Sequence, residues 1–335
     1  MTKVLILFFS IGVLFADEYD FDLSELEPKN YEYNGYLRID NKTKEPSTKE
    51  HQNYFHAEAL LDFSYFYEKF TFKNAFMANY DHIQNFEDDY FVSLNELYAE
   101  YKHNKNHSFL VGKKSLKWGK GYFYNPVAFL DREKDLSQPT QVREGFSLLR
   151  YNYNKSFRGD LKNLSLDLIY LASSKDLNSD FDPDSNNLAT RLYFLYYDTD
   201  IDLIYCYSDQ NNDKIGLDFS KNLQTNFEIH AEYSKVFNEK ESYLMGLRYL
   251  TSNELTIISE YFYNTNNFFV TLLTQKEPLD LPYLNVYAKN ITNLDSDLKQ
   301  NKLGFNYSFK NNMIVDLSYN HSTSELIWLQ IKWNF

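Results

Sequence analysis

The feature that most constrains the fold of this chain is an alternation of apolar and polar residues. It is clearest at the end of the sequence, in Leu326–Phe335, where the odd positions are apolar and the even positions from 330 onward are polar. These positions are Ile327, Leu329, Ile331, Trp333 and Phe335 against Gln330, Lys332 and Asn334. A period of two places alternate side chains on opposite faces of a β-strand. The segment is therefore predicted to be a strand with one apolar and one polar face.

The same alternation recurs upstream, for example over residues 55–65, 164–170, 227–234 and 303–309. Counting such segments predicts an all-β chain of about eighteen strands, within a range of 16–18. The predicted strands are 33–40, 54–67, 70–80, 91–103, 107–116, 145–154, 163–172, 188–198, 200–208, 213–221, 225–236, 241–251, 254–263, 267–276, 281–290, 300–309, 312–321 and 325–335. The pattern is less regular at 91–102 and 106–114, where a β-bulge or a buried lumenal patch is expected.

The bulk properties exclude several classes of protein. After residue 16 no apolar run approaches the 18 or more residues of a membrane-spanning helix. The net charge of −13 argues against a nucleic-acid partner, because phosphate binding needs clustered cations. Cys206 is the single cysteine, so a disulfide framework and a thiolate metal site are both excluded. The histidines are scattered, and neither a metal site nor a cofactor is expected.

The spacing between the predicted strands indicates an up-and-down barrel. The longest gaps are 41–53, 81–90, 117–144, 173–187 and 291–299, and all five follow odd-numbered strands. In a transmembrane barrel, long extracellular loops and short periplasmic turns alternate in this way. A soluble sandwich or propeller is the alternative, but only 10 glycines and no repeat of about forty residues are present.

At its final strand the sequence resembles Gram-negative outer-membrane β-barrels, whose last strand commonly ends in Phe. The resemblance implies a transmembrane antiparallel β-barrel in the outer membrane of a Gram-negative bacterium. It also implies that Trp333 and Phe335 are read by the barrel-assembly machinery. The expected partners are the lipid bilayer, lipopolysaccharide and small solutes, and a homotrimer remains open.

The chain is expected to divide into three parts. Residues 1–16 resemble a secretory signal peptide, since Lys3 precedes the apolar stretch Val4 to Phe15 and Ala16 is followed by Asp17-Glu18. Residues 17–32 are expected to be a periplasmic lead-in, and residues 33–335 the barrel, with a large loop at 117–144.

One stretch, Gly112–Gly145, carries more information about function than the rest. It holds seven cations against four acids in a chain that is acidic overall, and it is rich in aromatic residues. Its run GK-x4-WG-x-G-x3-NP is similar to a segment of other large porin-like barrels. The stretch is expected to fold into the lumen as a cationic and aromatic constriction, like the large loop of porins. The residues expected there are Lys117, Trp118, Lys120, Tyr122, Asn125, Arg132 and Arg143. The alternative is an extracellular loop whose lysines contact lipopolysaccharide.

The alternation also predicts which ionisable residues line the lumen. A Lys or Arg facing lipid near the midplane costs about 2–4 kcal/mol, so the charges of the strands are assigned to the interior. The predicted pore-lining residues are Arg38, Glu58, Asp62, Arg150, Arg191, Glu228, His230, Glu232 and Arg248. A further hypothesis places the four arginines in a basic ladder facing the loop. His230 and its neighbouring glutamates are interpreted as an interior salt-bridge cluster rather than a catalytic site, and no enzymatic activity is expected.

These predictions favour a porin-like channel for passive diffusion of small polar or anionic solutes. Charged rings in a pore filter solutes by size and charge without chemistry. Two alternatives remain at this point. The first is an outer-membrane transporter for hydrophobic or amphiphilic cargo, and the second is a structural or adhesive barrel.

Overall fold

The computed structural model describes residues 29–45, 52–84, 86–139 and 141–335. The predicted signal peptide, 1–16, and most of the predicted lead-in, 17–32, lie outside these residues. Within the described part, the first strand begins at Tyr31, two residues before the predicted start of the barrel.

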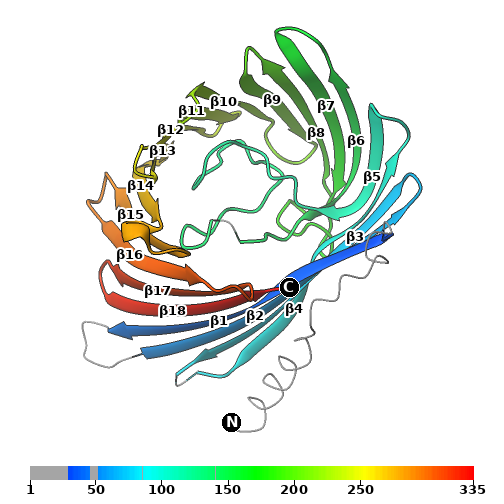
Figure 1. Ribbon diagram of the computed structural model, residues 1–335. Coiled ribbons are helices and arrows are strands. Elements are labelled where there is room, and N and C mark those ends of the chain that lie inside the picture. Colours follow the sequence, from blue (N-terminus) through cyan, green and yellow to red (C-terminus); the bar gives the residue numbers. More distant parts are fainter. Residues whose placement is uncertain (1–28, 46–51, 85, 140) are drawn as a thin grey trace.

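The chain forms eighteen strands in one antiparallel sheet, as the alternation predicted. The strands are β1 (Tyr31–Glu45), β2 (Gln52–Tyr67), β3 (Phe70–Ile83), β4 (Asp89–Lys102), β5 (His107–Lys114), β6 (Phe146–Ser156), β7 (Leu161–Ala172), β8 (Asn186–Tyr196), β9 (Thr199–Ser208), β10 (Lys214–Gln224), β11 (Phe227–Val236), β12 (Glu241–Leu250), β13 (Leu255–Asn264), β14 (Asn266–Lys276), β15 (Leu284–Asn293), β16 (Lys299–Ser308), β17 (Met313–His321) and β18 (Glu325–Asn334). Each strand pairs with its neighbours in sequence, and the pairing of β1 with β18 closes the sheet into a barrel (Figure 1).

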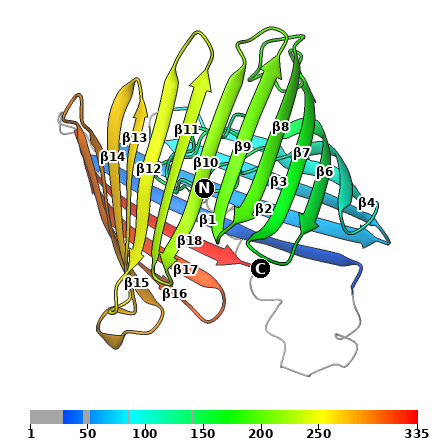
Figure 2. The same cartoon turned by 90° about the horizontal axis from the view of Figure 1, so that it is seen from above.

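The two ends of the sheet meet along a continuous ladder. Arg38 of β1 lies opposite Lys332 of β18, and Asp40 lies opposite Gln330. Next to this ladder, the backbone N–H of Phe335 donates to the carbonyl of Gly35 at 3.1 Å, and the N–H of Gly35 donates to the carbonyl of Phe335 at 3.0 Å. A β-carbon on Gly35 would lie 2.8 Å from the Phe335 ring, so this close approach requires glycine. Figure 2 shows the strands inclined to the barrel axis, as closure of a barrel requires.

Alternate residues of each strand face outward and inward, as expected. In β18 the outward side chains of Ile327, Leu329 and Ile331 are exposed. The inward side chains of β18 include Gln330, which donates to Asp40, and Trp328, which is 3% exposed. Trp328 is an aromatic residue on the inner face, and its indole N–H donates to Asp40 at 2.9 Å. Alternation therefore predicted the two faces correctly, although the inner face is not purely polar.

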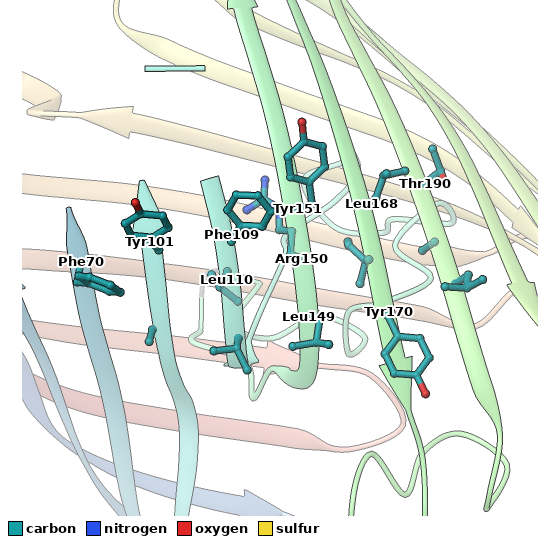
Figure 3. Close-up of a pocket in the computed structure, with 15 residues that line it drawn as sticks. Phe70, Tyr101, Phe109, Leu110, Leu149, Arg150, Tyr151, Leu168, Tyr170 and Thr190 are labelled. Carbon is teal, nitrogen blue, oxygen red and sulfur yellow. The ribbon is translucent and has the colours of Figure 1, made fainter. Parts of the chain in front are cut away.

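The outward face is broadly apolar, and a shallow groove of about 620 Å³ runs across β3 to β8 (Figure 3). Outward-facing aromatic and aliphatic side chains line it, among them Phe70, Tyr101, Phe109, Leu149 and Tyr170. Such a surface is suited to contact with lipid acyl chains rather than with water.

Long and short connections alternate less strictly than the gaps between the predicted strands suggested. The long connections are 115–145, after β5, and 173–185, after β7. Others are shorter than expected because β1, β3 and β15 extend to Glu45, Ile83 and Asn293. The connection after β13 is the single residue Thr265, whereas 277–283, after the even-numbered β14, is comparatively long and contains the short 3-10 helix η2 (Pro278–Asp280). Strand pairing therefore extends beyond the residues that alternate in the sequence, and the connections are correspondingly shorter.

A β-bulge is present at 91–102, whereas β5 pairs with β4 and β6 without a register shift, so no bulge is present at 107–114. The register of β3 against β4 shifts between Ala75 and Phe76, whose partners are Glu96 and Leu94. Asn95 is thus the extra residue of a β-bulge. Its backbone carbonyl accepts from the N–H of Gly145 at 2.9 Å, so the bulge supports the end of the long connection 115–145.

Within the described residues, no helix has the length and apolar content that crossing a membrane would require.

Candidate functional site in the barrel interior

Residues 115–145, the interior loop, run inside the ring of strands (Figure 1). The loop leaves β5, touches the opposite wall at β11 and β13, then approaches β15, β1 and β2 before returning to β6. We divide it into a first arm, residues 115–130, and a second arm, residues 131–139 and 141–145.

The first arm packs as a small hydrophobic core against the inner face of β5 to β9. Trp118, Val127 and Leu130 are at most 3% exposed and contact inward-facing apolar residues of that wall. Asp131 fixes the start of this arm, because its carboxylate accepts from the backbone N–H of Trp118 at 2.8 Å and of Leu116 at 3.1 Å. This side of the barrel interior is therefore filled.

Glu232 of β11 anchors the first arm through the loop backbone. Its carboxylate accepts from the N–H groups of Lys120, Gly121 and Val127, at 2.5, 2.6 and 3.3 Å, and from the amide of Asn125 at 2.9 Å. A buried carboxylate needs such donors to offset its desolvation. Gly121 fits here because a β-carbon would meet the carbonyl of Tyr124 at 2.0 Å.

A second acid, Glu260 of β13, continues this anchor. It accepts from the backbone N–H groups of Tyr122 and Phe123, the latter at 3.0 Å, and lies 3.1 Å from Nε2 of His230. The Tyr122 hydroxyl donates to Glu228 at 3.0 Å. His230 thus lies among interior carboxylates, and its closest one belongs to Glu260 of β13 rather than to its own strand.

Two of the five cations of the interior loop form ion pairs with acids in the described structure. Lys120 Nζ lies 2.8 Å from Asp202, and Arg132 forms ion pairs with Asp180 and Glu144. Arg143 donates to the backbone carbonyl of Arg132 at 2.5 Å. Lys117 is exposed and has a positive φ of 56°. Within the described residues Lys117, Lys134 and Arg143 form no ion pair, and Lys134 donates to the backbone carbonyl of Gly121 at 2.5 Å.

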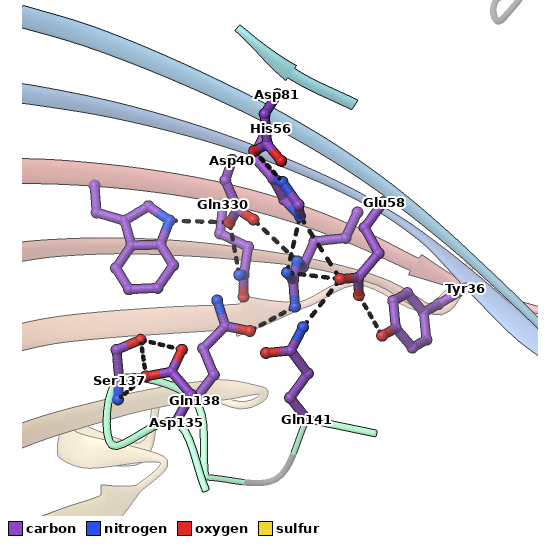
Figure 4. A network of polar contacts seen from close by, with 12 residues as sticks. Tyr36, Asp40, His56, Glu58, Asp81, Asp135, Ser137, Gln138, Gln141 and Gln330 are labelled. Atoms are coloured by element: carbon purple, nitrogen blue, oxygen red, sulfur yellow. Dashed lines mark hydrogen bonds and ion pairs between the residues drawn. The ribbon is translucent and has the colours of Figure 1, made fainter. Parts of the chain in front are cut away.

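The second arm contacts the wall through polar groups (Figure 4) and through Leu136 and Val142, which pack against apolar clusters of the interior. The amide oxygen of Gln138 accepts from Arg38, and the amide nitrogen of Gln141 donates to Glu58 at 3.0 Å. Lys289 of β15 donates to the backbone carbonyl of Leu136.

Arg38 is the centre of the polar network shown in Figure 4. Its guanidinium lies 2.9 Å from Asp40 and 3.1 Å from Glu58, and both carboxylates are buried. Nδ1 of His56 lies 2.7 Å from Asp81, while its Nε2 lies 3.2 Å from Arg38. The network joins β1, β2 and β3 to the second arm.

A cavity of about 370 Å³ lies between the second arm and the inner wall of β14 to β18 and β1. Four cations and one carboxylate line it: Arg38, Lys289, Lys302 and Lys332, with Asp316. Aromatic rings lie under two of the lysines, because Lys302 is 4.1 Å from the Trp328 ring and Lys332 is 4.0 Å from the Tyr36 ring. We call Lys289, Lys302 and Lys332 the wall lysines. In the described part of the chain, none of the three forms an ion pair.

The predicted basic ladder of four arginines does not form. Arg150 and Arg191 do lie together, since both approach Asp167, and Arg191 also pairs with Asp202 at 2.8 Å. Arg38 lies on the other side of the barrel, on β1, and Arg248 is exposed on β12 opposite Glu228. Asp62, also predicted to face inward, pairs with Lys73 at 2.9 Å.

The fold is similar to those of solved bacterial outer-membrane porins. OpdQ of Pseudomonas aeruginosa matches with a TM-score of 0.62 and 10% identity, over 92% of this chain and 99% of that chain. OccAB2 of Acinetobacter baumannii matches with a TM-score of 0.59 and 10% identity, over 91% and 98%. This chain has the porin fold. It matches no protein-family model and no curated protein sequence.

Within this porin fold, sequence reasoning missed several residues that line the cavity or contact the second arm. Lys289 lies in a predicted strand in which Leu284, Val286 and Ala288 alternate with the face that carries Lys289, so its inward direction could have been assigned. Gln138 and Gln141 carry no charge or aromatic ring that would distinguish them in a long loop. The inward direction of Asp40 could have been predicted, because it lies two residues from Arg38 on the same strand face.

Proposed function

We propose that this protein is an outer-membrane channel for the passive diffusion of small polar solutes, and that it favours anions. The observation that carries the proposal is the cavity beside the second arm, lined by four cations and one carboxylate. Because the first arm fills the opposite side, this cavity is the proposed narrow part of the pore. The interior loop thus serves as the constriction, with Lys117, Trp118, Lys120, Tyr122, Asn125, Arg132 and Arg143 shaping and stabilising it.

The wall lysines supply the proposed selectivity. Lys289 and Lys302 lie directly opposite each other on β15 and β16. Like charges in such a pair are destabilising, and a passing anion relieves the repulsion. The aromatic rings beside Lys302 and Lys332 compensate part of the cost of their desolvation without neutralising them, since a cation over a ring keeps its charge.

The remaining wall charges have a different proposed role. Glu58, Asp62, Arg150, Arg191, Glu228, His230 and Glu232 belong to pairs or clusters that solvate the inner wall and anchor the loop. Arg248 is exposed and adds to the charge of one pore mouth.

The porin fold and the apolar outward face support placement in the outer membrane of a Gram-negative bacterium, in contact with lipid and lipopolysaccharide. The signal-peptide pattern of residues 1–16 supports export. We propose that Trp333 and Phe335 form the assembly signal, and that the apolar groove on β3 to β8 is available to lipid or to other copies in a homotrimer.

The test is a reversal-potential measurement on purified protein in a planar bilayer, with a tenfold gradient of potassium chloride. We expect anion selectivity in the natural protein and a clear shift towards cations in the double variant Lys302→Gln, Lys332→Gln. The matched control is Lys310→Gln, which removes one exposed cation in the turn between β16 and β17 and leaves selectivity unchanged. Cation selectivity in the natural protein would refute the proposal. Absence of conductance would favour a closed structural barrel.

A further inference from the structure

The two arms of the interior loop are attached to the barrel in different ways. The first arm contributes buried apolar residues, including Trp118, Phe123 and Val127, and several backbone hydrogen bonds to Glu232 and Glu260. Between 131 and 144, none of the described residues is buried. A segment with few buried apolar contacts opens at lower free energy than its neighbours. The second arm is therefore the part of the loop that detaches from the wall at the lower free energy.

Three polar contacts attach the second arm to the opposite wall. In two of them the wall group is a cation and the loop group is a neutral acceptor: Lys289 donates to the carbonyl of Leu136, and Arg38 donates to the amide oxygen of Gln138. In the third, Gln141 donates to Glu58 at 3.0 Å. Four of these six residues, Lys289, Arg38, Gln138 and Gln141, line the 370 Å³ cavity.

These cations form stronger hydrogen bonds with an anion than with a carbonyl or an amide. A bond with one ionised partner is already roughly twice as strong as a bond between neutral groups, and an anionic acceptor adds the attraction between opposite charges. Lys289 gains further, because its cross-strand partner Lys302 carries the same charge and forms no ion pair in the described chain. A small anion in the cavity thus competes with Leu136 and Gln138 for the groups that retain the second arm.

We propose that the second arm is a latch that an anionic solute releases by displacing it from Lys289 and Arg38. The inference rests on the proposed function and adds its regulation: the solute widens its own passage. The first arm stays in place, because its anchors are carboxylates. Replacing one anionic acceptor by another brings no gain in hydrogen bonding. The pore then has a narrow state when empty and a wider state when anions are present.

The experiment records single-channel currents in a fixed concentration of potassium chloride while inorganic phosphate is added. We expect the natural protein to spend more time at a higher conductance level as phosphate rises, with saturation. In Gln138→Ala the ratio of wide to narrow state without phosphate should rise about fivefold to tenfold. That is the change given by loss of one hydrogen bond of about 1–1.4 kcal/mol.

The matched control is Ser137→Ala, the neighbouring residue, whose hydroxyl donates only to the side chain of Asp135. It should behave as the natural protein. Gln141→Ala provides a second latch variant, and circular dichroism checks that each variant folds.

The outcomes separate the two proposals. An anion-selective channel whose conductance levels do not respond to phosphate, and in which Gln138→Ala matches Ser137→Ala, overturns the latch alone. A channel without anion selectivity overturns the proposed function and the latch with it.

Discussion

At the scale of the residue, the interior is organised by carboxylates that accept hydrogen bonds from a loop backbone. Glu232 is the clearest example, because one buried side chain receives three backbone N–H groups and one side-chain amide. Alternation predicted that Glu232 faces inward. It did not predict the partners, since backbone donors occur at almost every position and leave no mark in the sequence.

Replacing Glu232 with Gln should loosen the first arm. A glutamine offers one acceptor oxygen instead of two and no charge, and hydrogen bonds to charged groups contribute about 1.5–3 kcal/mol each. We expect faster cleavage by trypsin after Lys117 or Lys120 in the detergent-solubilised protein. Glu254→Gln, in an exposed turn, is the control and should leave the cleavage rate unchanged. Equal rates in both variants would show that Glu232 does not anchor the loop.

The same scale explains why the prediction singled out the loop cations before the wall lysines that we propose to select anions. The loop lysines and arginines were conspicuous because they cluster in sequence, but Asp202, Asp180 and Glu144 pair with two of them, Lys120 and Arg132. The wall lysines are far apart in sequence and meet only because β15, β16 and β18 lie close in the closed sheet. Clustering along the chain was a poor guide to charge left unpaired in space.

At the scale of the element, strands were predictable and loop paths were not. A strand that has an apolar face and a polar face must alternate, and this requirement makes most of the eighteen strands recognisable in the sequence. The path of the interior loop depends on shape and on long-range partners. Its aromatic content correctly indicated that it packs against something, as Trp118 and Phe123 do.

Changes to the first arm should lower the stability of the barrel, whereas changes to the second arm should alter its conductance. Trp118→Ala removes a side chain that is 3% exposed, and such a truncation costs about 3–5 kcal/mol. We expect a lower thermal unfolding temperature. Replacing residues 134–141 with a short Gly-Ser linker removes no buried side chain among those described, so we expect a larger conductance at nearly unchanged unfolding temperature. Thermal melts and single-channel currents measure the two effects. A stable Trp118→Ala, or an unchanged conductance in the linker variant, would contradict this division.

At the scale of the whole molecule, the barrel depends on the meeting of its first and last strands. Ten residue pairs join β1 to β18, from Tyr36 opposite Asn334 to Glu45 opposite Glu325. Closure removes the unpaired edges that an open sheet would expose. The architecture was predictable because every strand pairs with its neighbour in sequence, and this is the simplest topology that alternation allows.

Deleting Trp333–Phe335 should therefore impair assembly rather than conduction. The deletion removes the two backbone hydrogen bonds between Gly35 and Phe335. It also removes the rings of Trp333 and Phe335, whose centroids lie 5.3 Å apart. We expect a reduced yield of inserted protein, measured in outer-membrane fractions. Phe335→Tyr keeps the ring and the backbone and should insert normally. Full insertion of the truncated chain would argue against an assembly role for this end.

The cross-strand pairing of Arg38 with Lys332 has a consequence for biogenesis. Part of the proposed filter lies on β1 and part on β18. The charged wall is therefore incomplete until the first and last strands of the nascent sheet have paired. An insertion intermediate arrested before that step would leak without discriminating between anions and cations. Ion discrimination thus provides an electrical report of barrel maturation, and it appears only with the last step of folding.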